Sequence, residues 1–415
     1  MNRTAYFIRP HSPLVFRSGR PFGEIDAGGA DVGYNFPLPT TIAGALRAAW
    51  VDANNHHVTS RDQTLLALHV HGGLRAVRRQ GSNGRAEITM FAAKPMDAVY
   101  EGVVGNAYDL LAVQTTTLSD GEGCVLPNKL LPLSSGTSAK PIAGPEAWSL
   151  DALANWMHGT LGSLSTSQGL ATMPHDKRTH VVIDETSQTN IKGGLYQSDG
   201  IDFDLPGEDQ GIVAWLGVHP GSKAASPNPV FSARMARLGA EGRTATFEEI
   251  VSDKCAVHST NCPASLSHKL DALKVGDQFR LLLLTPACYL RNGWYPDGLQ
   301  PKDKNDNDSA IEGCLVPLKS GDKDKDWTFR LRAAALDRWL PIASSSTRND
   351  EGSNKFTRRP LRRAVPSGTV YWLEIVRCGE TPLSQLWMQS TCRTDFSRDG
   401  FGLAIPGLTL CAERK

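Results

Sequence analysis

Four arginines fall within six residues near the C-terminal end of the chain, at positions 358, 359, 362 and 363. The planar guanidinium group offers paired N–H donors that match the oxygens of a phosphate. The segment from Thr328 to Arg363 holds nine basic and three acidic residues, so it carries +6 while the rest of a chain of net charge +1 carries −5. We therefore expect this cluster, which includes Arg362 and Arg363, to contact phosphate groups. A solvated surface loop is the alternative.

A glycine-rich stretch close to the C-terminus is the second candidate site. Gly400, Gly402 and Gly407 follow a G-x-G-x4-G spacing, which differs from the dinucleotide-binding pattern. Glycine lets a backbone approach a ligand closely, and Phe401 offers a ring on which a base can stack. The alternative is a turn between two strands.

The common catalytic motifs are missing from the sequence. It contains no G-x-x-x-x-G-K-[ST], no H-E-x-x-H and no G-x-S-x-G, which weakens hydrolase and nucleotide-motor interpretations. Zinc binding stays open. Four possible ligands, Cys255, His258, Cys262 and His268, fall within fourteen residues but lack the usual C-x2-C pair.

Short β-branched and aromatic runs predict strands at residues 4–10, 179–185, 211–218, 278–290 and 368–376. The clearest helical pattern spans 40–50, where Ile42, Leu46, Ala49 and Trp50 recur at helical spacing and Thr40 or Thr41 can cap the first turn. Residues 150–161 and 330–340 show weaker helical patterns.

These elements predict an α+β protein with two or three domains in 415 residues. A strand, a loop and a capped helix open the chain, and a second strand-first unit begins near Gly276, which repeats a β-α-β-β-α-β arrangement. No apolar run approaches the length of a membrane span. Because Arg9, Pro10 and His11 interrupt the apolar start, we expect a cytoplasmic protein without a signal peptide.

Several of these stretches, taken in order, resemble one family. They are "PLVFRSGRPFG", "FPLPTTIAGALRAAW", "THVVIDETSQTNIKGGLYQSDGIDF", "RLGAEGR", "NGWYP", "RRPLRRAVPSGTVYWLE" and "GFGLAIPG". The chain is similar to the third subunits of the Cmr complex, the type III-B CRISPR RNA-guided effector, which belong to the repeat-associated mysterious protein (RAMP) superfamily. It departs from the family's pattern at Ala240, where a second glycine is usual, and it lacks an expected Gly-Trp-Asp before the arginines.

The resemblance implies two ferredoxin-like domains with inserted loops and hairpins, at residues 1–255 and 256–415. It implies a non-catalytic subunit, without cofactor or metal, that acts in antiviral defence. Its expected partners are the 5′ repeat-derived tag of the guide RNA, the large polymerase/cyclase-like subunit and an adjacent backbone RAMP subunit. Such a task needs basic side chains, glycine-rich backbone and a few aromatic rings rather than an acid–base pair.

Each proposed RNA contact also has a structural alternative. A turn can clamp phosphates between two arginines, and the start of the first helix can hold a phosphate or simply be capped. Tyr196 can stack on a base or fill a core. The residues expected to contact RNA are Arg17, Ser18, Gly19, Arg20, Thr40, Thr41, Arg47, Arg178, Thr179, His180, Arg362, Arg363, Gly400, Phe401, Gly402 and Gly407. The alternative function is a guide-RNA processing endoribonuclease of the same superfamily, with His11, His175 or His180 as general base.

Overall fold

The chain folds into two compact units, each assembled from three segments. Unit 1 comprises Met1–Ile88, Thr172–Ala256 and Pro341–Arg363, and unit 2 comprises Thr89–Ala171, Val257–Leu340 and Ala364–Lys415. The computed structural model describes residues 3–16, 34–59, 62–81, 84–205, 207–218, 227–252, 255–257, 260–290, 293–303, 305–306, 308–342, 345–346, 357–358 and 361–410. The chain passes between units near the boundary expected at residue 255, but unit 2 also takes in residues 89–171.

Unit 1 is built on five neighbouring antiparallel strands of a ten-stranded sheet, in the order β3-β15-β1-β17-β16. If β1, β3, β15 and β17 are counted along the chain as first to fourth, they lie side by side in the order second, third, first, fourth. The elements of unit 1 are β1 (Arg3–Pro10), β2 (Leu14–Val15), α1 (Pro39–Ala53), α2 (Gln63–Ala67), β3 (Leu68–Gln80), β12 (His175–Ile183), β13 (Asn190–Ile201), β14 (Asp204–Leu205), β15 (Glu208–Val218), β16 (Arg234–Arg237), β17 (Thr244–Glu249), β24 (Ser345–Ser346) and β25 (Thr357–Arg358). The strands β12, β13 and β2 form a separate small sheet.

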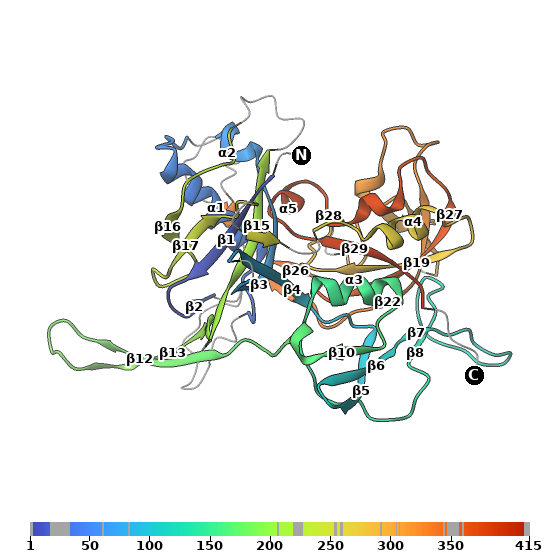
Figure 1. Ribbon diagram of the computed structural model, residues 1–415, viewed down its shortest axis with the longest axis horizontal. Coiled ribbons are helices and arrows are strands. Elements are labelled where there is room, and N and C mark those ends of the chain that lie inside the picture. Colours follow the sequence, from blue (N-terminus) through green and yellow to red (C-terminus); the bar gives the residue numbers. More distant parts are fainter. Residues whose placement is uncertain are drawn as a thin grey trace. The chain divides into compact units, whose positions relative to one another are not determined.

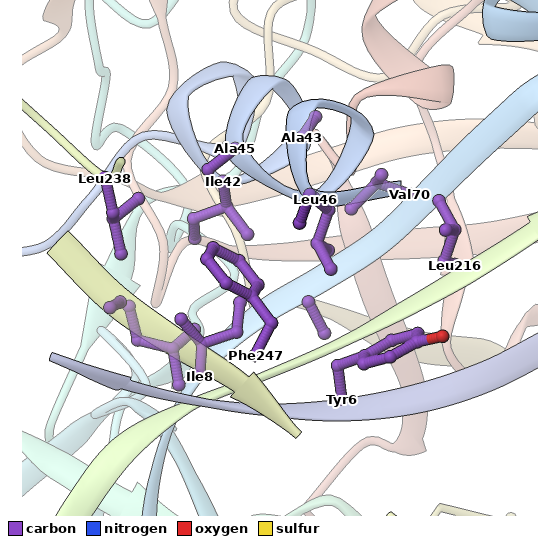
Figure 2. Close-up of a cluster of buried hydrophobic side chains, with 14 of the residues drawn as sticks. Tyr6, Ile8, Ile42, Ala43, Ala45, Leu46, Val70, Leu216, Leu238 and Phe247 are labelled. Carbon is purple, nitrogen blue, oxygen red and sulfur yellow. The ribbon is translucent and has the colours of Figure 1, made fainter. Parts of the chain in front are cut away.

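The core of unit 1 lies between α1 and this sheet, as Figure 2 shows. The helix expected over residues 40–50 is confirmed, and its periodic residues Ile42, Leu46, Ala49 and Trp50 are all buried. Strand alternation brings apolar residues to meet them, because successive side chains point to opposite faces of a sheet. Tyr6 and Ile8 of β1 and Phe247 of β17 therefore lie in the same cluster, with Val70 and Leu216 from β3 and β15.

Unit 2 contains a seven-stranded sheet with the order β20-β21-β22-β27-β19-β29-β28. Its central strands β22, β27, β19 and β29 again lie in the order second, third, first, fourth, with antiparallel neighbours. The elements of unit 2 are β5 (Ala98–Val104), β6 (Ala107–Ala112), β7 (Gln114–Thr115), β8 (Leu133–Ser134), β9 (Ala147–Ser149), α3 (Leu150–His158), β10 (Ser163–Ser165), β11 (Gly169–Leu170), α4 (Ala264–Asp271), β19 (Gln278–Leu283), β20 (Leu299–Pro301), β21 (Ile311–Gly313), β22 (Thr328–Ala335), β27 (Val370–Arg377), β28 (Gln389–Ser390), α5 (Thr394–Arg398) and β29 (Leu403–Leu408).

Four strands cross a unit boundary in sequence: β4 (Ala86–Ala93), β18 (Cys255–Val257), β23 (Leu340–Ile342) and β26 (Arg362–Ala364). The described elements are mostly strands with few helices, which agrees with a mixed α and β composition (Figure 1). Among them, no helix is both long enough and apolar enough to cross a membrane.

One expected helix is wrong. Residues 330–340 begin inside the strand β22, which pairs with β27. Its burial alternates, with Phe329, Leu331 and Ala333 buried and the arginines between them partly exposed. The alanines of this stretch favour a helix by propensity, but pairing in the sheet overrides propensity.

A fully buried ion pair fastens residues 89–171 to the sheet of unit 2. The guanidinium of Arg280 on β19 contacts the carboxylate of Asp97, and the two side chains are 1% and 0% exposed. Asp97 also accepts the indole N–H of Trp156 at 2.8 Å. Arg280 donates to the carbonyls of Trp156 and Leu408, each at 2.7 Å. The neighbouring groups satisfy the other donors and acceptors of the pair, so loss of either partner alone would leave a buried charge unpaired.

Candidate nucleic-acid interface

Three segments that lie far apart in the sequence meet at the end of β2. Val15 lies opposite Gly200 of β13. The backbone N–H of Ala240 donates to the Val15 carbonyl at 2.9 Å. A Cβ on Gly239, whose φ is +87°, would lie only 2.9 Å from the same oxygen, so this turn needs glycine to approach β2. The segments "PLVF", "DGIDF" and "RLGAEGR" are thereby neighbours in space.

The expected phosphate clamp, Arg17, Ser18, Gly19 and Arg20, lies outside the described residues. Its assignment stays a prediction. Phe16, which precedes it, is 6% exposed and belongs to the core of unit 1.

Helix α1 begins one residue before the expected threonines. Its N-cap is Leu38 and its first residue is Pro39, and no side chain caps the helix. The expected capping by Thr40 or Thr41 is therefore wrong, because Pro39 fixes a φ suited to the first helical position and places both threonines inside the first turn. Both are half-buried, and neither hydroxyl is used as a cap. Their contact with a phosphate stays a prediction.

Arg47 has an internal role. Its Nε and Nη2 donate to the carbonyl of Leu68 at 3.2 and 3.0 Å, which joins α1 to the start of β3. A charged donor that holds a backbone carbonyl is worth more than an average hydrogen bond. This contact accounts for Arg47 without RNA, and its expected RNA contact stays untested.

The strands β12 and β13 form a long two-stranded arm, visible in green in Figure 1. Three expected RNA contacts, Arg178, Thr179 and His180, lie on β12 within this arm. The Arg178 side chain is 53% exposed and pairs with Asp176 at 2.7 Å. The Nε2 atom of His180 lies 2.7 Å from the hydroxyl of Ser198. The side chain of Tyr196, on β13, lies outside the described part of the chain.

The arginine-rich stretch is only partly described. Arg362 is half-buried and Arg363 is exposed on β26, and Arg358 lies on β25 opposite Ser345. Arg359 lies outside the described residues. The Pro-Ser-Gly turn that follows is held tightly, because a Cβ on Gly368, with φ +83°, would lie 2.5 Å from the carbonyl oxygen of Lys94. The turn thus fixes where the arginines end and β27 begins.

The glycine loop at residues 400–402 has no free aromatic ring. Phe401 is 0% exposed, and its ring packs edge-on against Phe396 at a centroid distance of 5.6 Å. The expected base stacking on Phe401 is therefore wrong in this conformation, because the ring fills the core of unit 2. A turn between strands, the alternative, describes this loop better.

The backbone donors of this loop are also in use. The N–H of Gly402 donates to the Pro286 carbonyl at 2.8 Å, and the N–H of Leu403 to the Thr285 hydroxyl at 2.9 Å. The N–H groups of Gly400 and Phe401 donate to the carbonyls of Ser397 and Phe396 in α5. A phosphate bound here would have to displace these bonds, so the close approach that the glycines allow is used within the protein.

Gly407 serves the same kind of internal approach. A Cβ at this position on β29 would lie 2.5 Å from both the Cβ and the carbonyl oxygen of Met157 on α3. The glycine therefore lets the helix lie directly against the strand. The sequence correctly indicates that this position needs glycine for a close approach, but the group that approaches is helix α3 of the protein itself.

No three described His, Cys, Asp or Glu residues lie close enough to hold a metal ion. His258 lies outside the described residues. Burial raises the pKa of the Cys262 thiol to about 11, so this thiol is protonated at neutral pH unless a metal displaces the proton. Zinc binding stays open.

A buried histidine stands out on β3. His71 is 7% exposed, and neither of its ring nitrogens has a hydrogen-bond partner among the described residues. Burial lowers the pKa of His71 to about 3, with a further contribution from the positive charges of Arg3 and His69. His71 is therefore neutral at physiological pH.

The sequence interpretation missed a surface cavity of about 760 Å³ in unit 1, at the root of the β12–β13 arm. It is lined by Arg9, Pro10, His11, Ser12, Pro13, Asp176, Arg178, Asp202, Phe203, Asp204, Glu208, Asp209 and Gln210. These residues come from four separate stretches, so no local spacing could reveal them. His11 lies in the lining, with its Nε2 atom 2.7 Å from the Thr246 hydroxyl.

A family model described as CRISPR-associated protein (Cas_Cmr3) matches residues 6–409. The chain belongs to this family. This Cmr3-family chain is also similar to a solved chain in the cryo-EM structure of the Type III-B Cmr-beta bound to cognate target RNA, with 13% identity, a TM-score of 0.43, and coverage of 98% of this chain and 97% of that chain. A second similar chain is found in the cryo-EM structure of the Type III-B Cmr-beta bound to cognate target RNA and AMPPnP, with 15% identity and a TM-score of 0.37. That match covers 89% of this chain and 86% of the solved chain. No curated protein matches the Cmr3-family chain.

Proposed function

We propose that this chain is a non-catalytic subunit of a type III-B CRISPR effector complex in the cytoplasm. In this role it binds the 5′ repeat-derived tag of the guide RNA and docks on the large polymerase/cyclase-like subunit, beside an adjacent backbone RAMP subunit. The observation that carries the proposal is the match of the Cmr3 family across residues 6–409, which leaves almost no part of the chain for an unrelated activity.

The strand orders support two ferredoxin-like domains. In each unit the four central strands lie in the order second, third, first, fourth with antiparallel neighbours, which is the order of a β-α-β-β-α-β sheet. In unit 1 a helix follows the first strand and covers one face of the sheet, as that arrangement requires. Sheets of this kind serve RNA recognition in many proteins.

The exposed cations support contact with an RNA backbone. Arg363 on β26 is exposed, and Arg178 on the β12–β13 arm is more than half exposed. Among the described residues, the ion-pair partner of Arg178 is Asp176, two residues away on the same strand, and an exposed pair of this kind contributes little stability. A phosphate can therefore replace Asp176 as its partner at small cost.

An endoribonuclease is the second candidate, since the cavity in unit 1 combines a general base with charge stabilisers. His11, Arg9 and Arg178 all line it. Cleavage by the RNA 2′-hydroxyl needs one group to remove its proton and another to stabilise the developing charge. His175 is less suited because it does not line this cavity, although its Nδ1 atom lies 2.8 Å from the Asp199 carboxylate.

Affinity purification of the tagged chain from its native cells tests the proposal. Sequencing of the bound RNA should give guide RNAs that share a repeat-derived 5′ end, and protein identification should give the large subunit. Recovery of neither would refute the proposal. Incubation of the purified chain with repeat RNA should leave the RNA intact, whereas a 2′,3′-cyclic phosphate product lost in His11→Ala would establish the endoribonuclease.

A further inference from the structure

The cavity at the root of the β12–β13 arm has a buried floor and an exposed cationic rim. Phe203 and Gln210 are 4% and 3% exposed and lie deepest. The side chains of Arg9 and Arg178 are 54% and 53% exposed, so they lie at the opening. The volume of about 760 Å³ is sufficient for one nucleotide.

Both rim arginines are free to change partners. Arg9 lies 3.5 Å from Asp209, whose other carboxylate oxygen is bound more closely by Arg78 at 2.6 Å. Asp209 therefore keeps a cation when Arg9 moves away. Arg178 is held by Asp176 in an exposed pair, which is worth little in water.

Two carboxylates in the cavity have no cation. Within the described part of the chain, neither Asp202 nor Asp204 forms an ion pair, whereas Asp176, Glu208 and Asp209 each pair with an arginine. Asp202 uses one oxygen to accept the backbone N–H of Asp204 at 2.9 Å. Asp202 is half-buried and Asp204 is exposed, so their remaining oxygens can accept hydrogen bonds from water or from a bound ligand.

This arrangement selects among possible occupants. Asp202 and Asp204 repel a phosphate placed next to them, so an RNA backbone fits only at the opening beside Arg9 and Arg178. A lysine or arginine side chain of a protein would have to pass two guanidinium groups at the rim. An unpaired base meets neither obstacle, because it is neutral, and the rim arginines can bind the phosphates on either side of it.

We propose that this cavity holds one unpaired base of the bound RNA, and that the base carries an exocyclic amino group, with guanine preferred. The N1–H and N2–H of guanine can donate together to one carboxylate, while uracil offers a single N–H. Asp202 and Asp204 then determine specificity, and Arg9 and Arg178 hold the flanking phosphates. This inference rests on the proposed RNA-binding function and assigns it a base-reading site.

Isothermal titration of the full chain with guanosine, guanosine 5′-monophosphate and uridine tests the proposal without any variant. Guanosine should bind about tenfold more tightly than uridine, from the extra bidentate pair. The 5′-monophosphate should bind no more than a few-fold more tightly than guanosine, since one rim arginine gains a partner. Equal binding of the two nucleosides, or binding that depends on the phosphate, would overturn the base site. Binding of an Arg-Lys-Arg peptide in place of guanosine would assign the cavity to a protein partner.

The double variant Asp202→Asn and Asp204→Asn should lose about tenfold in guanosine affinity while it retains the acceptor for the backbone of residue 204. Asp52→Asn is the matched control, since Asp52 is an exposed carboxylate on α1 that pairs with Arg234 away from the cavity. Both proteins should unfold at the wild-type temperature. If the double variant binds guide RNA and guanosine as the wild type does, the base site is refuted while the proposed function stands. If the wild type does not bind guide RNA at all, the proposed function fails first.

Discussion

Replacing Gly402 by valine should destabilise the protein without a direct effect on RNA. The residue has φ +69°, and a Cβ there would lie 2.6 Å from the Sγ of Cys392 and 3.1 Å from the Thr391 hydroxyl oxygen. The left-handed backbone costs a side chain about 1–2 kcal/mol. Overpacking of a tight core costs about 1–3 kcal/mol more. We expect the free energy of unfolding to fall by about 2–5 kcal/mol in total.

Gly105→Val is a matched control in the same unit. Gly105 has φ +59°, but nothing lies within 4 Å of a Cβ built there. The control therefore carries the backbone strain alone, about 1–2 kcal/mol, and the difference between the two variants isolates the contact with Cys392. Urea unfolding of both variants and of the wild type measures this difference.

The affinity of each folded variant for guide RNA decides between a structural and a binding role for the loop. Because Phe401 is buried and the loop's backbone N–H groups have partners, the folded Gly402→Val protein should bind RNA as the wild type does. A variant with wild-type stability and lost RNA affinity would refute this reasoning and restore direct contact by the glycine loop.

Three further changes have defined outcomes. Arg280→Met should lower the free energy of unfolding by about 3–5 kcal/mol, because it leaves the buried carboxylate of Asp97 unpaired. The double variant with Asp97→Leu should recover most of this loss, as measured by urea unfolding. Neutralising Arg362 and Arg363 together should lower RNA affinity for all sequences and reduce the salt slope by about 1–2, whereas an effect on complex assembly alone would place them at the large subunit. His71→Leu should become more stable relative to the wild type as pH falls from 6.5 towards 3. Because the pKa of His71 is lowered to about 3 in the folded state, only the unfolded wild type binds a proton on this side chain between pH 6.5 and 3. The free energy of unfolding of the wild type should therefore fall by about 1.4 kcal/mol per pH unit relative to that of the variant. Unfolding free energies of the two proteins that change with pH in parallel would contradict this.

The sequence predicts well where one local signal agrees with the tertiary environment. Helix α1 has helical spacing of apolar residues and a proline at its first position, and it lies where expected because its apolar face meets the sheet. The strand expected at 4–10 is confirmed as β1, and the strand expected at 278–290 is confirmed only over Gln278–Leu283, where β19 ends. The helix predicted at residues 330–340 is wrong because an alanine-rich run favours a helix locally, and the pairing of β22 with β27 is not visible in the sequence.

The candidate site is less predictable, since a motif shows which residue is needed but not what it contacts. The glycines at 402 and 407 do allow close approach, yet the neighbours are Cys392 and Met157 of the protein itself. Conversely, Asp202 and Asp204 have no motif, and they become a candidate site only because β1, β12 and β15 bring other charges to the same cavity.

Comparison of two RNAs of equal length and composition tests the proposed function. One carries the guide's repeat-derived 5′ tag and the other carries the same tag nucleotides in permuted order, and each is titrated into the purified chain at two salt concentrations. We expect the native tag to bind at least about tenfold more tightly, about 1.4 kcal/mol, with the difference maintained at the higher salt because base contacts persist when phosphate contacts weaken. Equal affinities at both salt concentrations would contradict tag recognition by this chain.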